Sequence, residues 1–438
     1  MPSMRIRFND EQKKRATVIF IVLFVLITIG LICISRKTPP GNISNVVSRK
    51  ARVRTASLHR TNDCSKKVVW EDMTESIELA TNYMINAQTE EGNFIYEVDW
   101  KTGELTDDDN DVRQAGAFFG LALAFNDKPT SEVASAWRTA RVYWQRHSKE
   151  SIVGPGRFMK YPTKGKAMPA LACTTLAAMG YIDFLRTPES HDDPDWPIYK
   201  SELDELLKFL IYSMNDHTYL VPSYVKDNGE ATINANPYGN GEFLLCIIKA
   251  TKYLGYPYAT LAHNNALSGF EEWISGPLAE NDDPDETKGY YQWSSMSWYE
   301  LTTSTEFYSP TEEQVLNYRR WLVKMGYWII DKHRILRRKR NTGYAYEGII
   351  HAREAALALK TQEGDKAARY FAQTAHTGIC GLMQWQVGNR YQNDFVKGAK
   401  NDPNYLGGVQ NHASEPLLRI DTTQHQLHTY ILFLRYIA

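Results

Sequence analysis

Helical segments alternate with long polar loops six times along this chain, and this repeat constrains the fold more than any other feature. Each long loop joins two helical segments, and only a short connector leads to the next pair. The pairs are 74–88 with 113–126, 130–148 with 167–186, 200–215 with 240–254, 260–275 with 290–303, 311–330 with 344–360, and 364–386 with 422–437. Twelve helices in six hairpins predict a closed all-α (α/α)6 toroid. Because every long loop lies inside a hairpin, all six should meet at one end of the barrel, where a site is expected.

The two helices of a pair differ in composition. The first helix of the chain places Ile77, Ala80 and Met84 on one face, as expected for an outer helix packed on a core. The second helix of a pair is richer in small residues, as in 113–126, and apolar nearly all round, which predicts an inner ring. Between them, the alternating apolar residues of 93–105 predict a small β-hairpin in the long loop.

The N-terminus carries a candidate membrane anchor. Residues 16–35 form an uncharged apolar run of about 20 residues, long enough to span a bilayer. The run exceeds the usual apolar core of a signal peptide and lacks a cleavage motif. We therefore expect a cytosolic tail at 1–15, a signal anchor at 16–35, a stalk at 36–70 and the toroid domain at 71–438.

The predicted topology is that of a single-pass type II membrane protein. Basic residues flank the span on both sides, with Arg15 before it and Arg36 after it, so the charge bias is weak. Asn42 begins an Asn-X-Ser sequon and is the predicted glycosylation site. The large domain is accordingly expected in the lumen of the secretory pathway or at the cell surface.

The amino-acid composition limits the kinds of function that this chain can have. The formal net charge is −1, which argues against a nucleic-acid binder. Aromatic residues make up 12% of the chain, and Tyr and Trp suit either sugar faces or helix packing. Cys173, Cys246 and Cys380 lie in apolar helical stretches and are interpreted as buried thiols. No Cys/His spacing predicts a zinc site, and no metal or cofactor is expected.

A resemblance to a known group of enzymes follows from the first hairpin. Gln88, Gly92 and Phe94 end the outer helix as Q-x-x-x-G-x-F, before a loop and a small-residue inner helix. This arrangement resembles the six-hairpin toroid enzymes, which include glycoside hydrolases, polysaccharide lyases and epimerases. The resemblance covers about residues 70–438 and implies a carbohydrate-active enzyme, without identifying a particular family.

An acidic cluster precedes the first inner helix. Asp107 and Asp109 lie just before it, and Arg113 and Gln114 occupy its first turn. Aspartate in this position caps a helix, which is the structural interpretation. Crowded carboxylates also raise one another's pKa, which suits a general acid. The string 107–111 matches the DDxxD metal motif of terpene synthases as well, a weaker alternative because no second metal motif appears.

Two other loops supply the remaining candidates for catalysis. Asp421 and His425 are four residues apart at the start of the last inner helix, so they share a face, unless Asp421 is the N-cap. Glu242 lies in the first turn of the third inner helix. The predicted catalytic residues are Asp107, Asp109, Glu242, Asp421 and His425. Two carboxylates from this set would provide the pair used by most glycosidases.

Aromatic, amide and arginine side chains at the loop end are the candidates for substrate binding. They are Trp100, Arg113, Gln114, Arg157, Tyr161, Asn236, Tyr238, Tyr291, Trp293, Arg340, Tyr344 and Arg419. Arginine pairs bidentately with carboxylates, so an acidic sugar such as a uronate fits them. The basic run 334–340 is interpreted as a solvated loop, with Arg340 as its one candidate.

The sequence therefore predicts a membrane-anchored enzyme that acts on a glycan, with glycoside hydrolysis by paired carboxylates as the leading hypothesis. A polysaccharide lyase or uronyl C5-epimerase with a Tyr or His base is an alternative, and a non-catalytic glycan-binding or scaffold toroid is another. The expected partners are a glycan and, through residues 16–35, a membrane. If chemistry occurs, the candidate residues should converge on one funnel.

Overall fold

The computed structural model describes residues 68, 70–162, 168–391, 395–399 and 402–437, which belong to one compact unit. The predicted tail, membrane span and nearly all of the stalk, including Asn42, lie outside the described residues. None of the helices that are described is both long and apolar enough to cross a membrane.

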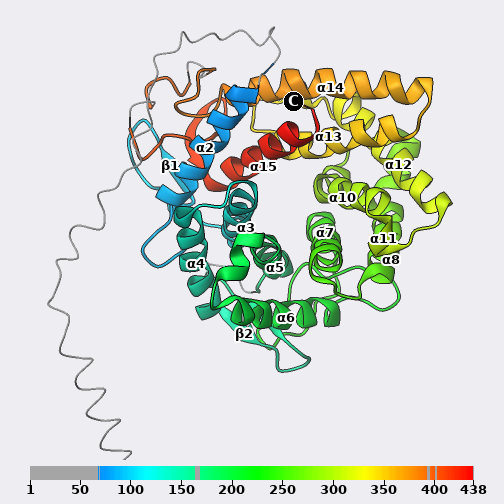
Figure 1. Ribbon diagram of the computed structural model, residues 1–438, viewed down its shortest axis with the longest axis horizontal. Coiled ribbons are helices and arrows are strands. Elements are labelled where there is room, and N and C mark those ends of the chain that lie inside the picture. The colour runs from blue at the N-terminus through cyan, green and yellow to red at the C-terminus, as the bar shows by residue number, and fades with distance from the viewer. Residues whose placement is uncertain (1–67, 69, 163–167, 392–394, 400–401, 438) are drawn as a thin grey trace, which may run out of the picture. The chain divides into compact units, whose positions relative to one another are not determined.

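Six helices form the inner ring of a toroid (Figure 1). They are α3 (Asp111–Asp127), α5 (Leu171–Leu185), α7 (Pro237–Leu254), α10 (Asp285–Thr303), α13 (Gly343–Ala358) and α15 (Ile420–Tyr436). Each packs against the next, and α15 packs against α3 to close the ring. The predicted order and number of inner helices are confirmed.

Six further helices surround this ring. They are α2 (Trp70–Asn86), α4 (Ser131–Arg146), α6 (Trp196–Tyr212), α8 (Ala259–Phe270), α12 (Glu312–Tyr327) and α14 (Gln362–Met383). In every pair the outer helix precedes the inner one; a long loop joins them in five pairs, whereas in the fourth only residues 281–284 separate α9 from α10. The long loops consequently share one end of the barrel with the N-termini of the inner helices.

Small residues allow the inner helices to pack closely. Every residue of α5 is buried, and Gly180 lies where a Cβ atom would stand 2.8 Å from the ring of Phe118. The carbonyl of Gly180 accepts a hydrogen bond of 3.2 Å from the indole of Trp137 on α4. A larger residue at position 180 would force two helices apart, which explains the small-residue composition of the ring.

Helix ends follow local capping rules. Asn110 caps α3 by accepting the Arg113 amide, and Asn236 caps α7 by accepting the Gly239 amide at 2.7 Å. Thr311 and Gln314 form a capping box at the start of α12. These caps fix where two of the inner helices begin, and so which side chains face the barrel end.

The strands tie the first and last loops together. The sheet has the order β1 (Glu97–Asp99), β5 (Glu415–Arg419) and β4 (Gln410–His412), all antiparallel, and β2 (Ser148–Glu150) pairs with β3 (Arg157–Met159). The predicted hairpin is present only in part. A bridge between Val98 and Leu105 closes its turn, but the main partner of β1 is β5 in the sixth loop.

Short helical pieces complete the unit. They are η2 (Pro188–Asp192), the π-helical turn η3 (Glu271–Ser275), α9 (Gly276–Glu280), α11 (Thr305–Tyr308), the π-helical turn η4 (Trp328–Lys332) and η5 (Ile335–Arg337). The segments predicted as single helices over 260–275 and 311–330 thus each end in a π-helical turn.

The cysteines differ from the prediction at one position. Cys173 and Cys246 are buried free thiols, as expected. Cys380 is disulfide-bonded, so its interpretation as a free core thiol is wrong. The apolar surroundings of Cys380 on α14 gave no sign of a partner distant in the sequence.

Candidate active site

A pocket of about 720 Å³ opens at the loop end of the barrel, among the N-termini of the inner helices. Many of the sequence candidates line it. They are Arg113, Asn236, Tyr238, Glu242, Trp293, Arg340, Tyr344, Arg419, Asp421 and His425. They come from α3, the loop before α7, α7 itself, α10, the loop before α13, α13, β5 and α15. The toroid therefore brings together residues that lie hundreds of positions apart.

The acidic cluster before α3 does not share this pocket. Asp107 and Asp109 line a separate depression with Leu105 and Pro162. Asp109 accepts hydrogen bonds from the Tyr161 hydroxyl at 2.5 Å and from Gln114 Nε2 at 2.9 Å. The expectation that these carboxylates join Glu242 and Asp421 is wrong, because Asn110 takes the N-cap position and turns the preceding aspartates away.

Four more candidates hold the loops rather than line the pocket. The buried Gln114 side chain bonds both the amide and the carbonyl of Phe94, at 2.9 and 2.8 Å. The Trp100 indole donates to Gln410 Oε1 at 3.0 Å. Arg157 bonds the carbonyl of Ser148 at 2.9 Å, and the buried Tyr291 hydroxyl donates to the Ala345 carbonyl at 3.3 Å. Their hydrogen bonds are satisfied within the protein.

Asp421 is enclosed by two guanidinium groups. Arg113 Nη1 lies 2.6 Å from Asp421 Oδ2, and Arg419 contacts both carboxylate oxygens at 3.0 and 2.8 Å. The expected pairing of Asp421 with His425 is therefore wrong, since the arginines occupy the carboxylate. Charge-assisted bonds at both oxygens are stronger than neutral hydrogen bonds and hold the carboxylate in place.

His425 is oriented by a carboxylate that sequence reasoning missed. Its Nδ1 lies 3.4 Å from Oε1 of Glu347 on α13, and its Nε2 lies 3.1 Å from Nε2 of Gln292 on α10. An amide nitrogen can only donate, so the Nε2 of His425 accepts and its proton is assigned to Nδ1, facing Glu347. The ring of Trp293 stands 5.5 Å from the imidazole and fixes its plane.

Glu347 is fully buried and serves two histidines. His428 Nδ1 lies 3.1 Å from the same Oε1 atom that faces His425. Burial opposes ionisation of Glu347, but the neighbouring His428 and His425 outweigh it and hold its pKa below the ordinary value. An ionised carboxylate behind an imidazole stabilises the imidazolium that forms when His425 takes a proton. One feature of the sequence could have identified Glu347 as a candidate: it lies near the start of an inner helix, as Glu242 does.

Glu242 has the opposite character. Its side chain lines the pocket but is only 3% exposed, and its Oε2 atom has no hydrogen-bond partner among the described residues. Burial raises its pKa well above the ordinary value, which favours the protonated carboxyl. A protonated carboxyl in a pocket has the form required of a general acid.

Cationic and aromatic side chains surround these two groups. Arg113, Arg340 and Lys288 line the pocket with Tyr238 and Tyr344. Lys288 lies over the Tyr238 ring at 5.7 Å. The surroundings therefore combine aromatic rings with cations and with the carboxyl groups of Glu415 and Asp421. Among the described residues, no three metal-ligating side chains cluster as they would around a metal ion.

Comparison with solved structures identifies relatives of the fold. Cellobiose 2-epimerase from Spirochaeta thermophila superposes with a TM-score of 0.56 at 13% identity, covering 84% of this chain and 96% of that one. A D-mannose isomerase gives 0.54 at 11%, covering 84% and 98%. A GH76 α-mannanase from Bacteroides thetaiotaomicron gives 0.52 at 11%, covering 82% and 94%. Neither a protein-family model nor a curated protein sequence matches the chain.

These likenesses establish the fold. The chain has the (α/α)6 toroid of the six-hairpin carbohydrate-active enzymes, and the resemblance inferred from the first hairpin is confirmed at that level. Epimerase, isomerase and mannanase share the toroid, so the choice of reaction depends on the groups in the pocket.

Proposed function

We propose that this chain is a sugar-transforming enzyme in which His425 and Glu242 move protons on a bound sugar. One observation carries the proposal: a histidine oriented by a buried carboxylate and a buried glutamic acid whose pKa is raised line the same pocket. Proton abstraction next to a carbonyl requires a base and an acid within reach of the same substrate. The epimerases and the isomerase that share the fold support this class of reaction.

The proposed reaction begins on the open-chain form of a reducing sugar. The bound sugar displaces Gln292 from His425 Nε2, which removes the proton from the carbon next to the carbonyl, and the electron pair of that C–H bond forms a C=C bond. The carbonyl oxygen takes the proton of Glu242, which gives a neutral enediol and a glutamate. Glu347 stabilises the imidazolium through Nδ1.

The second half returns both protons. Glu242 recovers a proton from an enediol hydroxyl as that oxygen becomes the carbonyl, and the imidazolium of His425 delivers its proton to carbon. Delivery to the neighbouring carbon gives an isomer, and delivery to the same carbon, after the enediol has turned its other face to His425, gives an epimer. No water is consumed in either case.

Hydrolysis is the second candidate, favoured by the shared fold of the α-mannanase and by the three carboxyl groups that line the pocket, those of Glu242, Glu415 and Asp421. Glu242 would be the acid, and Asp421 would be the base or nucleophile. We place hydrolysis second because Arg113 and Arg419 occupy both oxygens of Asp421.

We propose an acidic sugar as the substrate, since Arg340 lines the pocket with no side-chain ion pair among the described residues, whereas Arg113 and Lys288 pair with Asp421 and Asp285. We further propose that residues 16–35 anchor the domain in a membrane of the secretory pathway. The disulfide at Cys380 supports an oxidising compartment.

The reaction class is tested by incubating the full-length protein with neutral and uronate-bearing reducing sugars and oligosaccharides in water enriched in ¹⁸O. Mass spectrometry and sugar chromatography then follow the products. We expect a change of sugar identity with no chain cleavage. New reducing ends carrying ¹⁸O would establish hydrolysis instead.

A further inference from the structure

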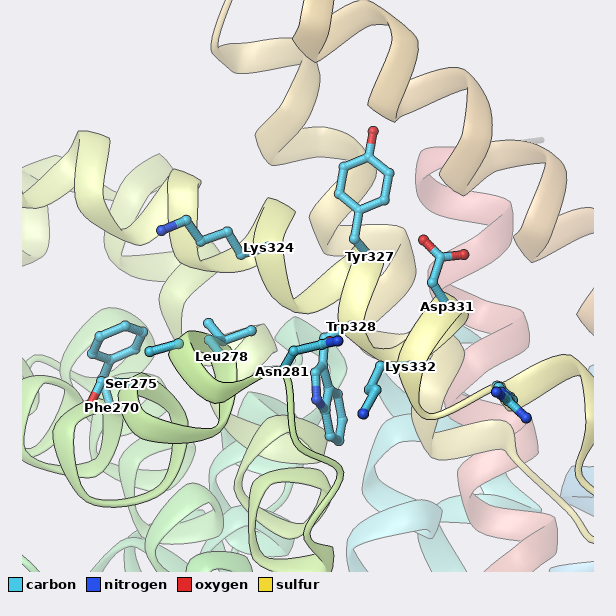
Figure 2. Close-up of a pocket in the computed structure, with 11 residues that line it drawn as sticks. Phe270, Ser275, Leu278, Asn281, Lys324, Tyr327, Trp328, Asp331 and Lys332 are labelled. Carbon is cyan, nitrogen blue, oxygen red and sulfur yellow. The ribbon is translucent and has the colours of Figure 1, made fainter.

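A second cavity, of about 900 Å³, lies on the outside of the barrel between two neighbouring outer helices (Figure 2). One wall is formed by the end of α8 with η3 and α9, and the other by the end of α12 with η4. None of the residues that line it belongs to the active-site pocket. The cavity is therefore a separate feature of the surface.

Two π-helical turns shape the cavity. α8 runs into η3, and α12 runs into η4, so both walls of the cavity carry this rare geometry. In η4, the amide of His333 bonds the Trp328 carbonyl at 2.9 Å, which is the i→i+5 bond of a π-turn. In η3, the Trp273 carbonyl accepts the Thr287 hydroxyl at 2.7 Å. Such turns are costly and are frequent at functional sites.

The aromatic residues of the cavity are held rigidly. Phe270 stacks on Trp321 with ring centres 3.8 Å apart. The Trp328 indole donates to the Asp282 carbonyl at 2.8 Å. Tyr327 stacks on Tyr370. Rings fixed in this way lose little conformational entropy when a ligand binds.

Three cations at the cavity have no side-chain partner among the described residues. Lys324, Lys332 and Arg334 line it without a hydrogen bond or ion pair of their side chains. By contrast, Lys208 on the outer helix α6 pairs with Glu205, and Lys128 at the C-terminal end of α3 pairs with Glu78. The one acidic residue that lines the cavity is Asp331, which accepts the Tyr370 hydroxyl. The cavity is thus a cationic site with a rigid aromatic surface.

We infer that this cavity is a non-catalytic binding site for an acidic saccharide. Aromatic rings suit the apolar faces of sugar rings, and the cations pair with carboxylate or sulfate groups. The basic run 334–340 connects the two sites in the sequence, since Arg334 lines this cavity and Arg340 lines the active-site pocket. A site of this kind holds a charged chain on the enzyme. The inference does not depend on which reaction the other pocket performs.

The test uses the full-length protein, with tetragalacturonate as the acidic probe and cellotetraose as the neutral one. Hydrogen exchange of the segments 270–281 and 324–334 locates binding at this cavity. We expect tetragalacturonate to protect both segments and cellotetraose to protect neither. Lys324→Ala/Lys332→Ala should weaken this binding about tenfold or more, because two charge-assisted contacts are lost.

A matched control removes the same charge elsewhere. Lys366→Ala/Arg369→Ala lies on the exposed face of α14 and should leave binding unchanged. Glu242→Gln should also leave protection of the two segments unchanged, whatever it does to turnover. The inference is overturned if the control pair weakens binding equally, if cellotetraose protects as well, or if neither probe protects these segments.

Discussion

Nδ1 of His425 lies 3.4 Å from Oε1 of Glu347, so the histidine that lines the pocket is held by a buried carboxylate from the neighbouring inner helix. The same oxygen of Glu347 lies 3.1 Å from Nδ1 of His428. This arrangement favours the ionised form of Glu347. It also assigns the proton of His425 to Nδ1, so that the unprotonated Nε2 accepts from Gln292.

Replacing Glu347 with Gln should therefore lower kcat by about 100-fold or more, the range for loss of effective base catalysis. KM should change little, because Glu347 does not line the pocket. Glu354→Gln on the same helix is the control. Equal kinetic effects of the two changes would contradict a positioning role for Glu347.

Glu242→Gln should abolish turnover while raising stability. Burial raises the pKa of Glu242, so above the unfolded-state pKa the folded protein binds more protons than the unfolded protein. The free energy of unfolding due to this group therefore falls as pH rises from about 4.5 toward the folded-state pKa. Glutamine does not ionise, so Glu242→Gln removes this pH-dependent loss of unfolding free energy. The stabilisation relative to wild type should be larger at pH 8 than at pH 5, as measured by urea unfolding. A pH-independent difference would show that Glu242 does not titrate in this way.

Asp421→Asn separates the two candidate reactions. If Asp421 only holds Arg113 and Arg419, the change should raise KM by several-fold and leave kcat within about tenfold, because the arginines lose their alignment. If Asp421 is a hydrolytic base or nucleophile, kcat should fall by orders of magnitude with little change in KM. Steady-state kinetics distinguishes these outcomes, with the substrate that the incubation with neutral and uronate-bearing sugars identifies.

Asp109→Ala should affect stability more than catalysis. The change leaves Tyr161 and Gln114 without their carboxylate acceptor, which costs about 1–3 kcal/mol of unfolding free energy. The value of kcat/KM should stay within about threefold, since Asp109 lies outside the pocket. The exposed Asp107→Ala is the control for stability. If Asp109→Ala lost as much activity as Glu242→Gln, the acidic cluster would belong to the active site after all.

The proposed topology has its own measurement. Protease added to sealed microsomes should spare the domain after residue 36, and Asn42→Gln should increase gel mobility by removing one glycan. Digestion of the domain in intact vesicles would reverse the orientation.

The fold could be predicted because it repeats. Twelve amphipathic segments in a fixed alternation define six hairpins, and the small residues around Gly180 mark the inner ring. The location of the pocket followed from the same geometry. The pairing of side chains inside the pocket did not follow from that geometry. Asp421 and His425 share a helix face, but their partners, Arg113 and Glu347, come from other helices.

The π-helical turns escaped prediction for a different reason. The segments 260–275 and 311–330 keep an apolar helical pattern through η3 and η4, and the turns there involve tertiary contacts such as that of Thr287 with Trp273. Likewise, Asp109 is a plausible cap in sequence, and only the structure shows Asn110 in that role.

The central claim is that His425 and Glu242 transfer protons on the carbon framework of a sugar. Incubation of a turned-over sugar in D₂O, followed by ¹H NMR, measures this directly. The account predicts deuterium at the carbon next to the carbonyl with wild-type protein, and at least 100-fold slower incorporation with His425→Asn or Glu242→Gln. Turnover of a glycan with no carbon-bound deuterium, undiminished in His425→Asn, would contradict it.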